Sequence, residues 1–383
     1  MKGTSLKTTK TFLFASATLT VLFVLSLPSA VAVTIDTVPV GNPGNGNDSL
    51  TGNVYGGVAA SYRIGTTEVT NAQYVAFLNA KAASDPFGLF NENNAVGGIT
   101  RSGISGSFTY SAKTDMGNKP VNYVSWYDAI RFANWLNNGQ GAGSTETGAY
   151  TLGALLPNGT PVNGSSIIRN PGGTWFLTSE NEWYKAAYYQ PAAQGGDADS
   201  YWLYPTASNV APTNATATAV GDIGNPGPNI ANYSTGADWN GLDGNVTTVG
   251  SAGPLSQGFY GTSDQGGNVW EWNEALINGS SRGARGGSIG PASASSELRS
   301  VRRNLDDPTN EYGHFGFRVA TVPEPSSFVL AALGLICVAA CAVRARRTAN
   351  SVRATARRPR LTSRFRTLPK RADMCRQGSR ASA

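Results

Sequence analysis

The residues with the clearest chemical potential lie in a short glycine-rich segment of the C-terminal half. Asp264, Asn268 and Glu271 place three oxygen-bearing side chains within eight residues, around Gly266 and Gly267. Calcium binds about six to eight oxygen ligands, which it takes from carboxylates, amides and backbone carbonyls in a flexible geometry. Glycine allows the backbone to turn its carbonyl groups inward. The segment therefore predicts a calcium site.

A second interpretation of the same segment needs no metal. Glu271 would then pair with an arginine, and Arg285, Arg299 and Arg318 are candidates further along the chain. The aspartate and asparagine residues would only shape turns, because their short side chains hydrogen-bond to nearby backbone groups. The residues alone leave both interpretations open.

Thiol and imidazole chemistry is almost excluded in the main part of the chain. Cys337 and Cys341 lie in an apolar run and Cys375 lies near the C-terminus, so residues 33–321 contain no cysteine. That stretch can form no disulfide, thiolate nucleophile or thiolate metal site. His314 is the only histidine, and we interpret it as structural. We find no nucleophile elbow, phosphate-binding loop or zinc signature, whereas a carboxylate pair of the glycosidase type stays open.

Three capping boxes predict the helices that would position these residues. In each box a hydroxyl residue is followed by Gln, Asp or Glu at the third position after it, and then by apolar residues at helical spacing. The boxes begin at Thr70, Ser125 and Ser179. Their Trp and Tyr residues are predicted to belong to the core. Glycine and asparagine are abundant elsewhere, so we expect loops to dominate, with a short strand in residues 33–60 and a long surface loop over residues 204–229.

The N-terminus has the layout of a secretory signal peptide. Basic residues precede an apolar run over residues 12–27, and Ala30-Val31-Ala32 provides a small-residue cleavage site. We therefore expect export and removal of residues 1–32. An N-terminal anchor helix is the weaker alternative, because the run is short for a bilayer span.

The C-terminus carries a second targeting pattern. Pro323-Glu324-Pro325 precedes an apolar run over residues 328–343, and a cluster of arginines begins at Arg344. The run would be about 24 Å long as a helix, and basic residues beyond it fit the cytoplasmic side of a membrane. One C-terminal transmembrane helix is therefore predicted. The basic tail over residues 348–383 is interpreted as disordered rather than as nucleic-acid binding.

Six short strings mark the main part of the chain. The most specific is Gly266-Gly267-Asn268-Val269-Trp270-Glu271-Trp272. The five others begin at Ile64, Pro120, Leu177, Arg285 and Gly316. In content and order the strings resemble those of the formylglycine-generating enzyme (sulfatase-modifying factor) family. The resemblance implies an α+β domain related to the C-type lectin fold, with little regular secondary structure. The C-terminal pattern resembles the PEP-CTERM sorting signal of Gram-negative bacteria, which implies export, membrane insertion and a sorting protease as partner.

The resemblance also implies two calcium sites. The first would take the side chains of Asp264 and Glu271 and the carbonyls of Gly267 and Val269. The second would take the side chains of Asn232 and Asp243 and the carbonyls of Tyr233 and Asn245. Calcium is therefore the expected cofactor.

The family's catalytic chemistry does not carry over to this chain. Its oxidases hold copper(I) with two cysteines that follow the Gly-Gly-Ser string, and Pro291 and Ser296 occupy those positions here. A soft cuprous ion needs thiolates, so no copper is expected. Ser288 and Trp270 match positions that line the family's pocket and are interpreted as scaffold. The related sulfoxide synthases use three histidines, and this chain has one.

These observations predict an exported, membrane-anchored and non-catalytic domain that calcium stabilises. It would bind an extracellular ligand such as a carbohydrate or a protein of the exopolysaccharide matrix, and no nucleic acid. A formylglycine-generating oxidase and a structural envelope component are the alternatives. The predicted organisation is a signal peptide (1–32), a lead-in (33–60), the family domain (61–321), the sorting signal with its transmembrane helix (322–347) and the tail (348–383).

Overall fold

Each of the three capping boxes begins a helix. Thr70 caps α1 (Asn71–Lys81), Ser125 caps α2 (Trp126–Asn137) and Ser179 caps α3 (Glu180–Tyr188). In every box the hydroxyl accepts a hydrogen bond from a backbone N–H of the first turn, and the Gln, Asp or Glu accepts one from the cap. This reciprocal pair satisfies two donors that a helix start leaves without partners. The predicted helix starts are confirmed.

The computed structural model describes residues 32–92, 97–323 and 340–344. Within these residues the strands form two four-stranded sheets. One sheet is antiparallel and joins, in spatial order, β1 (Thr37–Val40), β2 (Tyr62–Gly65), β12 (Val319–Thr321) and β5 (Trp175–Leu177). The other joins β10 (Asn304–Asp306), β9 (Ser281–Arg285), β8 (Trp270–Ile277) and β11 (Phe315–Gly316), the last pair being parallel.

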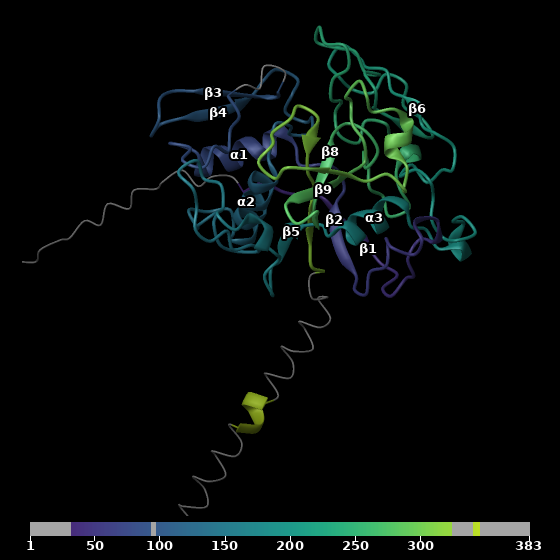
Figure 1. Cartoon of the computed structure of the whole chain (residues 1–383), viewed down its shortest axis with the longest axis horizontal. Helices are drawn as coiled ribbons and strands as arrows, with labels where there is room; N and C mark the ends of the chain where they lie inside the picture. The colour runs from purple at the N-terminus through teal and green to yellow at the C-terminus, as the bar shows by residue number, and fades with distance from the viewer. Residues whose placement is uncertain (1–31, 93–96, 324–339, 345–383) are drawn as a thin grey trace, which may run out of the picture. The chain divides into compact units, whose positions relative to one another are not determined.

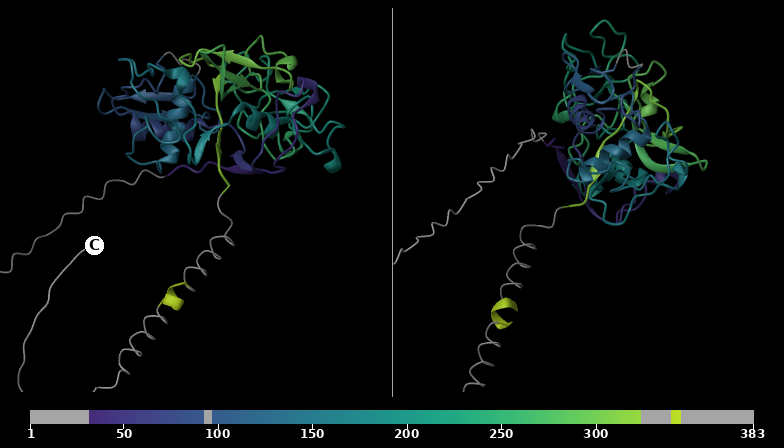
Figure 2. Two further views of the ribbon diagram at one scale, coloured as in Figure 1. Left: turned by 60° about the horizontal axis from the view of Figure 1, so that its bottom comes forward. Right: turned by 90° about the vertical axis from the view of Figure 1, so that its left-hand side faces the viewer.

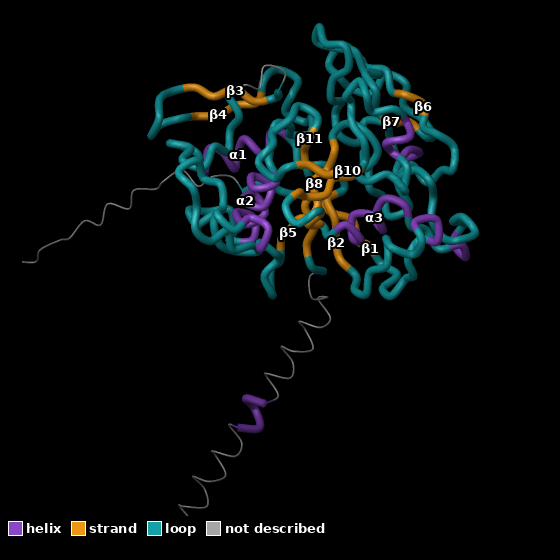
Figure 3. Tube along the Cα trace, in the orientation of Figure 1, coloured by secondary structure: helices purple, strands orange, loops and turns teal. Residues whose placement is uncertain are grey.

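Loops and two short ribbons complete the first of the chain's two units, Met1–Pro323. The ribbons are β3 (Ile99–Ser102) with β4 (Thr109–Ala112), and β6 (Thr213–Asn214) with β7 (Ile230–Ala231). Figure 3 shows how much of this unit is loop, which confirms the prediction of a mixed domain with little regular structure.

The two sheets bring distant parts of the sequence together. Figure 1 shows β8 and β9 near the middle of the unit, with α1 and the β3–β4 ribbon on one side and β6 on the other. The last strand of the unit, β12, lies between β2 and β5, and Figure 2 shows the end of the unit beside its purple N-terminal strands. The segment before β12 therefore contacts residues from the start of the domain.

Aromatic side chains of α1, α2 and the segment before β12 form the centre of the core. Tyr74, Phe77, Phe132, Trp135 and Phe317 are buried, and their ring centroids lie 5.3–6.4 Å apart. Edge-to-face pairs at this spacing add to the free energy gained by burial. The aromatic residues of the first two helices are thus core residues, as predicted.

The segment over residues 204–229 is only partly a surface loop. It contains β6, and its residues Ala215 and Ile223 are buried against Ile230 and Ala252. The sequence prediction missed this small cluster because its apolar residues are too widely spaced to show a period.

The second unit covers Glu324–Ala383. Its described residues, 340–344, are helical. Across the described parts of the chain, no helix combines the length and apolar character needed to cross a membrane. The predicted span over residues 328–343 lies mostly outside the described residues, as does nearly all of the predicted signal peptide, so both stay predictions.

Candidate functional site

Glu271 on β8 forms a fully buried ion pair with Arg318, the residue before β12. The guanidinium donates from Nε to Oε2 at 2.5 Å and from Nη2 to Oε1 at 2.6 Å, and both side chains are 0% exposed. Trp183 also donates from Nε1 to Oε2 at 2.7 Å. Both carboxylate oxygens therefore have charge-assisted donors in a two-pronged geometry. Of the arginine partners left open by the sequence, Arg318 is the one that pairs with Glu271.

The remaining donors of Arg318 hold two other segments in place. Its Nη1 donates to the carbonyl of Gly65 at the end of β2, and its Nη2 donates to the carbonyl of Ser263, each at 3.0 Å. Arg285, another candidate, instead pairs with Glu180 at 2.7 Å. Arg318 thus links β8, β2 and the segment before Asp264 through one buried cation.

Two further carboxylates surround this ion pair. Glu68, just after β2, is 1% exposed, and neither of its carboxylate oxygens has a hydrogen-bond partner. Asp264 is partly buried and accepts one backbone hydrogen bond, from Gly250 to Oδ2 at 2.5 Å. Burial and then the Asp264 charge raise the pKa of Glu68 well above its usual range, and burial raises the pKa of Asp264 to about 6. Three carboxylates thus share one guanidinium.

The first predicted calcium set fits this arrangement in part. Asp264 offers a carboxylate with few partners, whereas the Glu271 carboxylate is directed at Arg318 and Trp183. Gly267 lies so close to Asn232 that an added Cβ would sit 2.2 Å from its carbonyl oxygen. The glycine is therefore required for a close backbone approach. The ligand roles of Gly267, Val269 and Glu271 stay predictions.

The second predicted set also fits in part. Asn232 is buried, and its Nδ2 lies 2.8 Å from the carbonyl oxygen of Asn245 and 2.9 Å from Oδ1 of Asn268. Its Oδ1 has no hydrogen-bond partner. The opposite orientation of this amide would place three oxygens together, an arrangement that a bound cation stabilises. Asp243 is exposed, and the carbonyl of Tyr233 stays a prediction.

No three His, Cys, Asp or Glu side chains gather to hold a metal ion in the part of the chain that the structure describes. Any calcium site here therefore depends on backbone carbonyls, amides and water in addition to carboxylates. Such mixed oxygen sets are typical of calcium.

The positions that match the family's cysteines lie on the surface. Pro291 and Ser296 are exposed, in the loop and short 3-10 turn that follow β9. Ser288 is buried, where its Oγ accepts the N–H of Gly290 at 3.2 Å, and Trp270 is buried at the start of β8. These four side chains contain carbon, nitrogen and oxygen atoms but no sulfur. They do not fit the thiolate requirement of copper(I).

His314 lies near the same loop and has structural neighbours. Its ring stacks on Tyr312 with centroids 5.5 Å apart and an interplanar angle of 6°. Burial lowers its pKa. These contacts agree with the interpretation of His314 as a structural residue.

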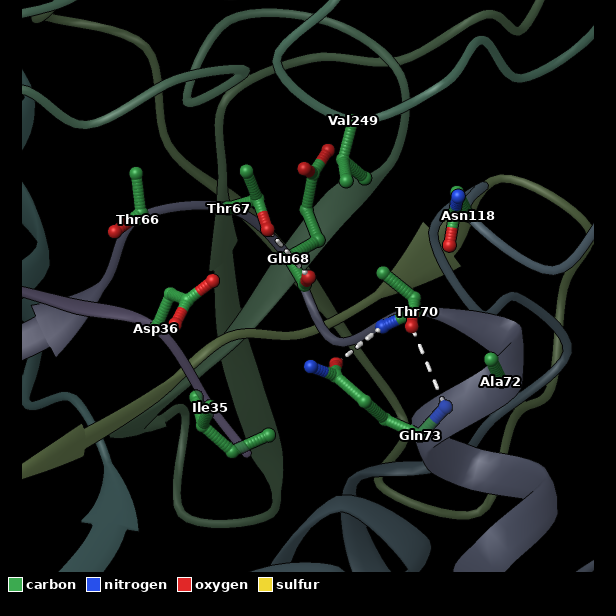
Figure 4. A pocket seen from close by; sticks show the side chains of 10 residues that line it. All are labelled: Ile35, Asp36, Thr66, Thr67, Glu68, Thr70, Ala72, Gln73, Asn118 and Val249. Atoms are coloured by element: carbon green, nitrogen blue, oxygen red, sulfur yellow. Dashed lines mark hydrogen bonds between the residues drawn. The ribbon is translucent and has the colours of Figure 1, made fainter. Parts of the chain in front are cut away.

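A pocket of about 410 Å³ opens beside Glu68. Figure 4 shows its polar walls, with the Glu68 carboxylate directed toward Val249, which precedes the Gly250 that donates to Asp264. The lining residues are Ile35, Asp36, Thr66, Thr67, Glu68, Thr70, Ala72, Gln73, Asn118 and Val249. Sequence reasoning missed Glu68 as a site residue. The available signal was the position of the Glu68 carboxylate in the sequence, between Ile64 of the strand and Val69, which is buried.

A smaller pocket of about 150 Å³ contains a second carboxylate pair. Asp128 closes the capping box of α2, and Glu311 lines the same pocket from a different segment. Burial raises the pKa of Asp128 to about 6, and burial with the Asp128 charge raises the pKa of Glu311 to about 8. Arg131, in the same pocket, is committed to Glu146 at 2.8 Å. The Arg131 charge lowers the pKa of Asp128 but offsets its burial only in part.

This pair predicts a pH-dependent stability. A carboxyl group whose pKa rises on folding stabilises the fold below its unfolded pKa of about 4, and that contribution is lost as the pH rises through the folded pKa. We expect the melting temperature of chelator-treated protein to fall between about pH 5 and about pH 8. The melting temperature of Glu311→Gln should fall less over this range. The variant should be more stable than wild type at the upper pH by about 1–2 kcal/mol. The control is Asp243→Asn, because Asp243 is exposed. Equal slopes of melting temperature against pH for Glu311→Gln and wild type would contradict the assignment.

Comparisons with known proteins agree with the resemblance. The profile of the sulfatase-modifying factor enzyme 1-like domain matches residues 37–322, and that of the PEP-CTERM protein-sorting motif matches residues 321–347. No curated protein matches the sequence.

Several solved structures are similar to the chain. They include CarF (22% identity, TM-score 0.47, covering 76% of this chain and 99% of that one). Variable protein 1 of Treponema denticola has 19% identity and a TM-score of 0.43, with 77% of this chain and 98% of that one covered. PvdO from Pseudomonas aeruginosa has 18% identity and a TM-score of 0.38, with 69% and 82% covered. From the profile match over most of its length, we conclude that the chain belongs to the family of the sulfatase-modifying factor enzyme 1-like domain and carries a PEP-CTERM sorting motif.

Proposed function

We propose that this protein is an exported, calcium-stabilised binding domain without the oxidase activity that the family resemblance implies. The observation that carries the proposal is the surface position of Pro291 and Ser296, which stand where the oxidases have copper-binding cysteines. Residues 33–321 contain no cysteine and therefore no thiol. The thioether of Met116 is buried against Trp239, Val246 and Val269.

Calcium has a structural role in this proposal. Asp264 with the carbonyls of Gly267 and Val269 would hold one ion, and Asn232 with the carbonyls of Tyr233 and Asn245 would hold a second. The support is chemical, since both places offer hard oxygen donors, and Oδ1 of Asn232 at the second place is buried without a hydrogen-bond partner. A bound cation would offset negative charge and tie together loops that have little regular structure.

Carbohydrate is the favoured ligand over a matrix protein. The pocket in Figure 4 has a volume within the roughly 300–1,000 Å³ that small-ligand sites occupy. Its walls present threonine hydroxyls, the amides of Gln73 and Asn118, and the carboxylate of Asp36. Such groups exchange hydrogen bonds with a polyhydroxyl ligand. A relation to the C-type lectin fold is consistent with this proposal.

The sorting motif gives the place of action. PEP-CTERM motifs are typical of proteins exported to the cell envelope in Gram-negative bacteria. We propose that a sorting protease processes the chain and that residues 328–343 anchor it in the membrane before that step. The ligand-binding domain would then face the extracellular matrix.

The purified domain is expected not to make formylglycine. Copper-loaded protein would be incubated with a sulfatase-type Cys-x-Pro-x-Arg peptide, and mass spectrometry would detect any conversion of the cysteine to an aldehyde. Wild type should not exceed a copper-only control, because no thiolates are present to retain the ion. Turnover above that control would instead favour the oxidase alternative. The Pro291→Cys, Ser296→Cys double variant asks separately whether the loop still accepts copper.

Binding to carbohydrate is expected to depend on the wall of the larger pocket. The domain would be applied to an array of extracellular polysaccharides in calcium. Asn118→Ala should weaken any retained signal several-fold, because this exposed side chain lines the pocket. Asn158→Ala, in the smaller pocket, is the matched control. If no polysaccharide is retained, or if both variants bind like wild type, the structural-component alternative or another surface is favoured.

A further inference from the structure

The walls of the larger pocket carry acidic groups without a matching cation. Ten residues line this pocket, and they include Asp36 and Glu68 but no lysine, arginine or histidine. Lys119, next to the lining residue Asn118, is buried and donates its ammonium group to the carbonyl of Val220 at 2.7 Å and to the hydroxyl of Thr248 at 2.6 Å. A ligand in the pocket therefore faces two carboxyl groups whose charge the lining residues do not balance.

The first sheet brings the two acids to the same end of a pair of strands. Thr37 begins β1 and lies opposite Gly65, the last residue of β2. Asp36 directly precedes β1, and its carbonyl accepts the N–H of Thr66 at 2.9 Å, two residues before Glu68. The Asp36 side chain is exposed, whereas Glu68 is 1% exposed. The fold thus places one acid at the surface of the pocket and the other in its wall.

The Glu68 carboxylate is left without compensation inside the protein. Both of its oxygens are buried without a hydrogen-bond partner, and the guanidinium of Arg318 donates to Glu271 instead. Such a group costs free energy unless a positive charge or a hydrogen bond offsets its burial. Water screens a buried charge only weakly, so Glu68 can attract a cation in the pocket without touching it. A cation there would in turn favour the charged form of this carboxylate.

The rest of the wall fits a ligand that carries hydroxyl groups. Thr66 with its hydroxyl and Asn118 with its amide also line the pocket, and Asn118 is exposed. The volume of about 410 Å³ suits a small molecule rather than a bare ion. The pocket therefore combines groups that exchange hydrogen bonds with hydroxyls and groups that attract a positive charge.

We propose that this pocket binds an amino sugar whose amine is free and positively charged, with Asp36 in contact with the ammonium group and Glu68 attracting it from the wall. The inference rests on the carbohydrate part of the proposed function and narrows the ligand to a cationic one. A neutral sugar would satisfy the groups that bind hydroxyls but would leave the carboxylates unbalanced. A lysine-rich protein would supply positive charge but no hydroxyl-bearing ring.

Two oligosaccharides that differ mainly in charge test the proposal. Calorimetry would compare a β-linked glucosamine tetrasaccharide, with its amines protonated, with the glucose tetrasaccharide of the same linkage, and tetralysine would serve as a cation without sugar rings. We expect the purified wild-type protein to bind the glucosamine form about tenfold more tightly, and added salt to reduce the difference. Glu68→Gln and Asp36→Asn should each lose most of this preference. Asp199→Asn, which removes an exposed acid outside the pocket, is the matched control.

The outcomes separate this inference from the carbohydrate proposal. If wild type binds the two tetrasaccharides equally and Asn118→Ala weakens both, the pocket binds carbohydrate but the amino-sugar inference is wrong. Binding of tetralysine as tightly as the glucosamine tetrasaccharide would also overturn it, because charge alone would then suffice. If neither tetrasaccharide binds, the inference fails, and the polysaccharide array decides the carbohydrate proposal separately. Should Glu68→Gln fail to fold, the exposed Asp36→Asn variant carries the test, and an unchanged preference in that variant would contradict the proposal.

Discussion

The buried pair of Glu271 and Arg318 is the interaction on which the centre of this domain depends. A buried ion pair stabilises a protein only when its geometry offsets the cost of removing two charges from water. Here the guanidinium is fully engaged, by Glu271 and by the carbonyls of Gly65 and Ser263. One side chain thereby connects β8 of one sheet to β2 of the other. Loss of either charge would leave the other uncompensated inside the core.

The calcium site that we propose lies beside this pair. Arg318 donates to Glu271 and to the carbonyls of Gly65 and Ser263, so Glu68 and Asp264 are left without a direct hydrogen bond from it. A domain made largely of loops has few backbone hydrogen-bond ladders with which to hold its segments. An ion that gathers several loop oxygens would supply that constraint.

The features that were predictable from the sequence are those with local causes. The helix starts at Thr70, Ser125 and Ser179 follow from capping boxes that involve neighbouring residues alone. The partner of Glu271 was narrowed to a few arginines, but the choice of Arg318 depends on how β12 enters the first sheet. Glu68 was missed because its surroundings in the fold include Asn118 and Val249, which are far away in the sequence. Gly- and Asn-rich loops carry no periodicity that would reveal such contacts.

Long-wavelength anomalous diffraction from crystals of the domain grown in calcium tests the central claim most directly, because it locates the ion relative to each carboxylate. We expect an anomalous peak within about 2.3–2.6 Å of a carboxylate oxygen of Asp264, with Glu271 still paired to Arg318. A peak coordinated by Glu271, or no peak beside Asp264 at saturating calcium, would contradict the account.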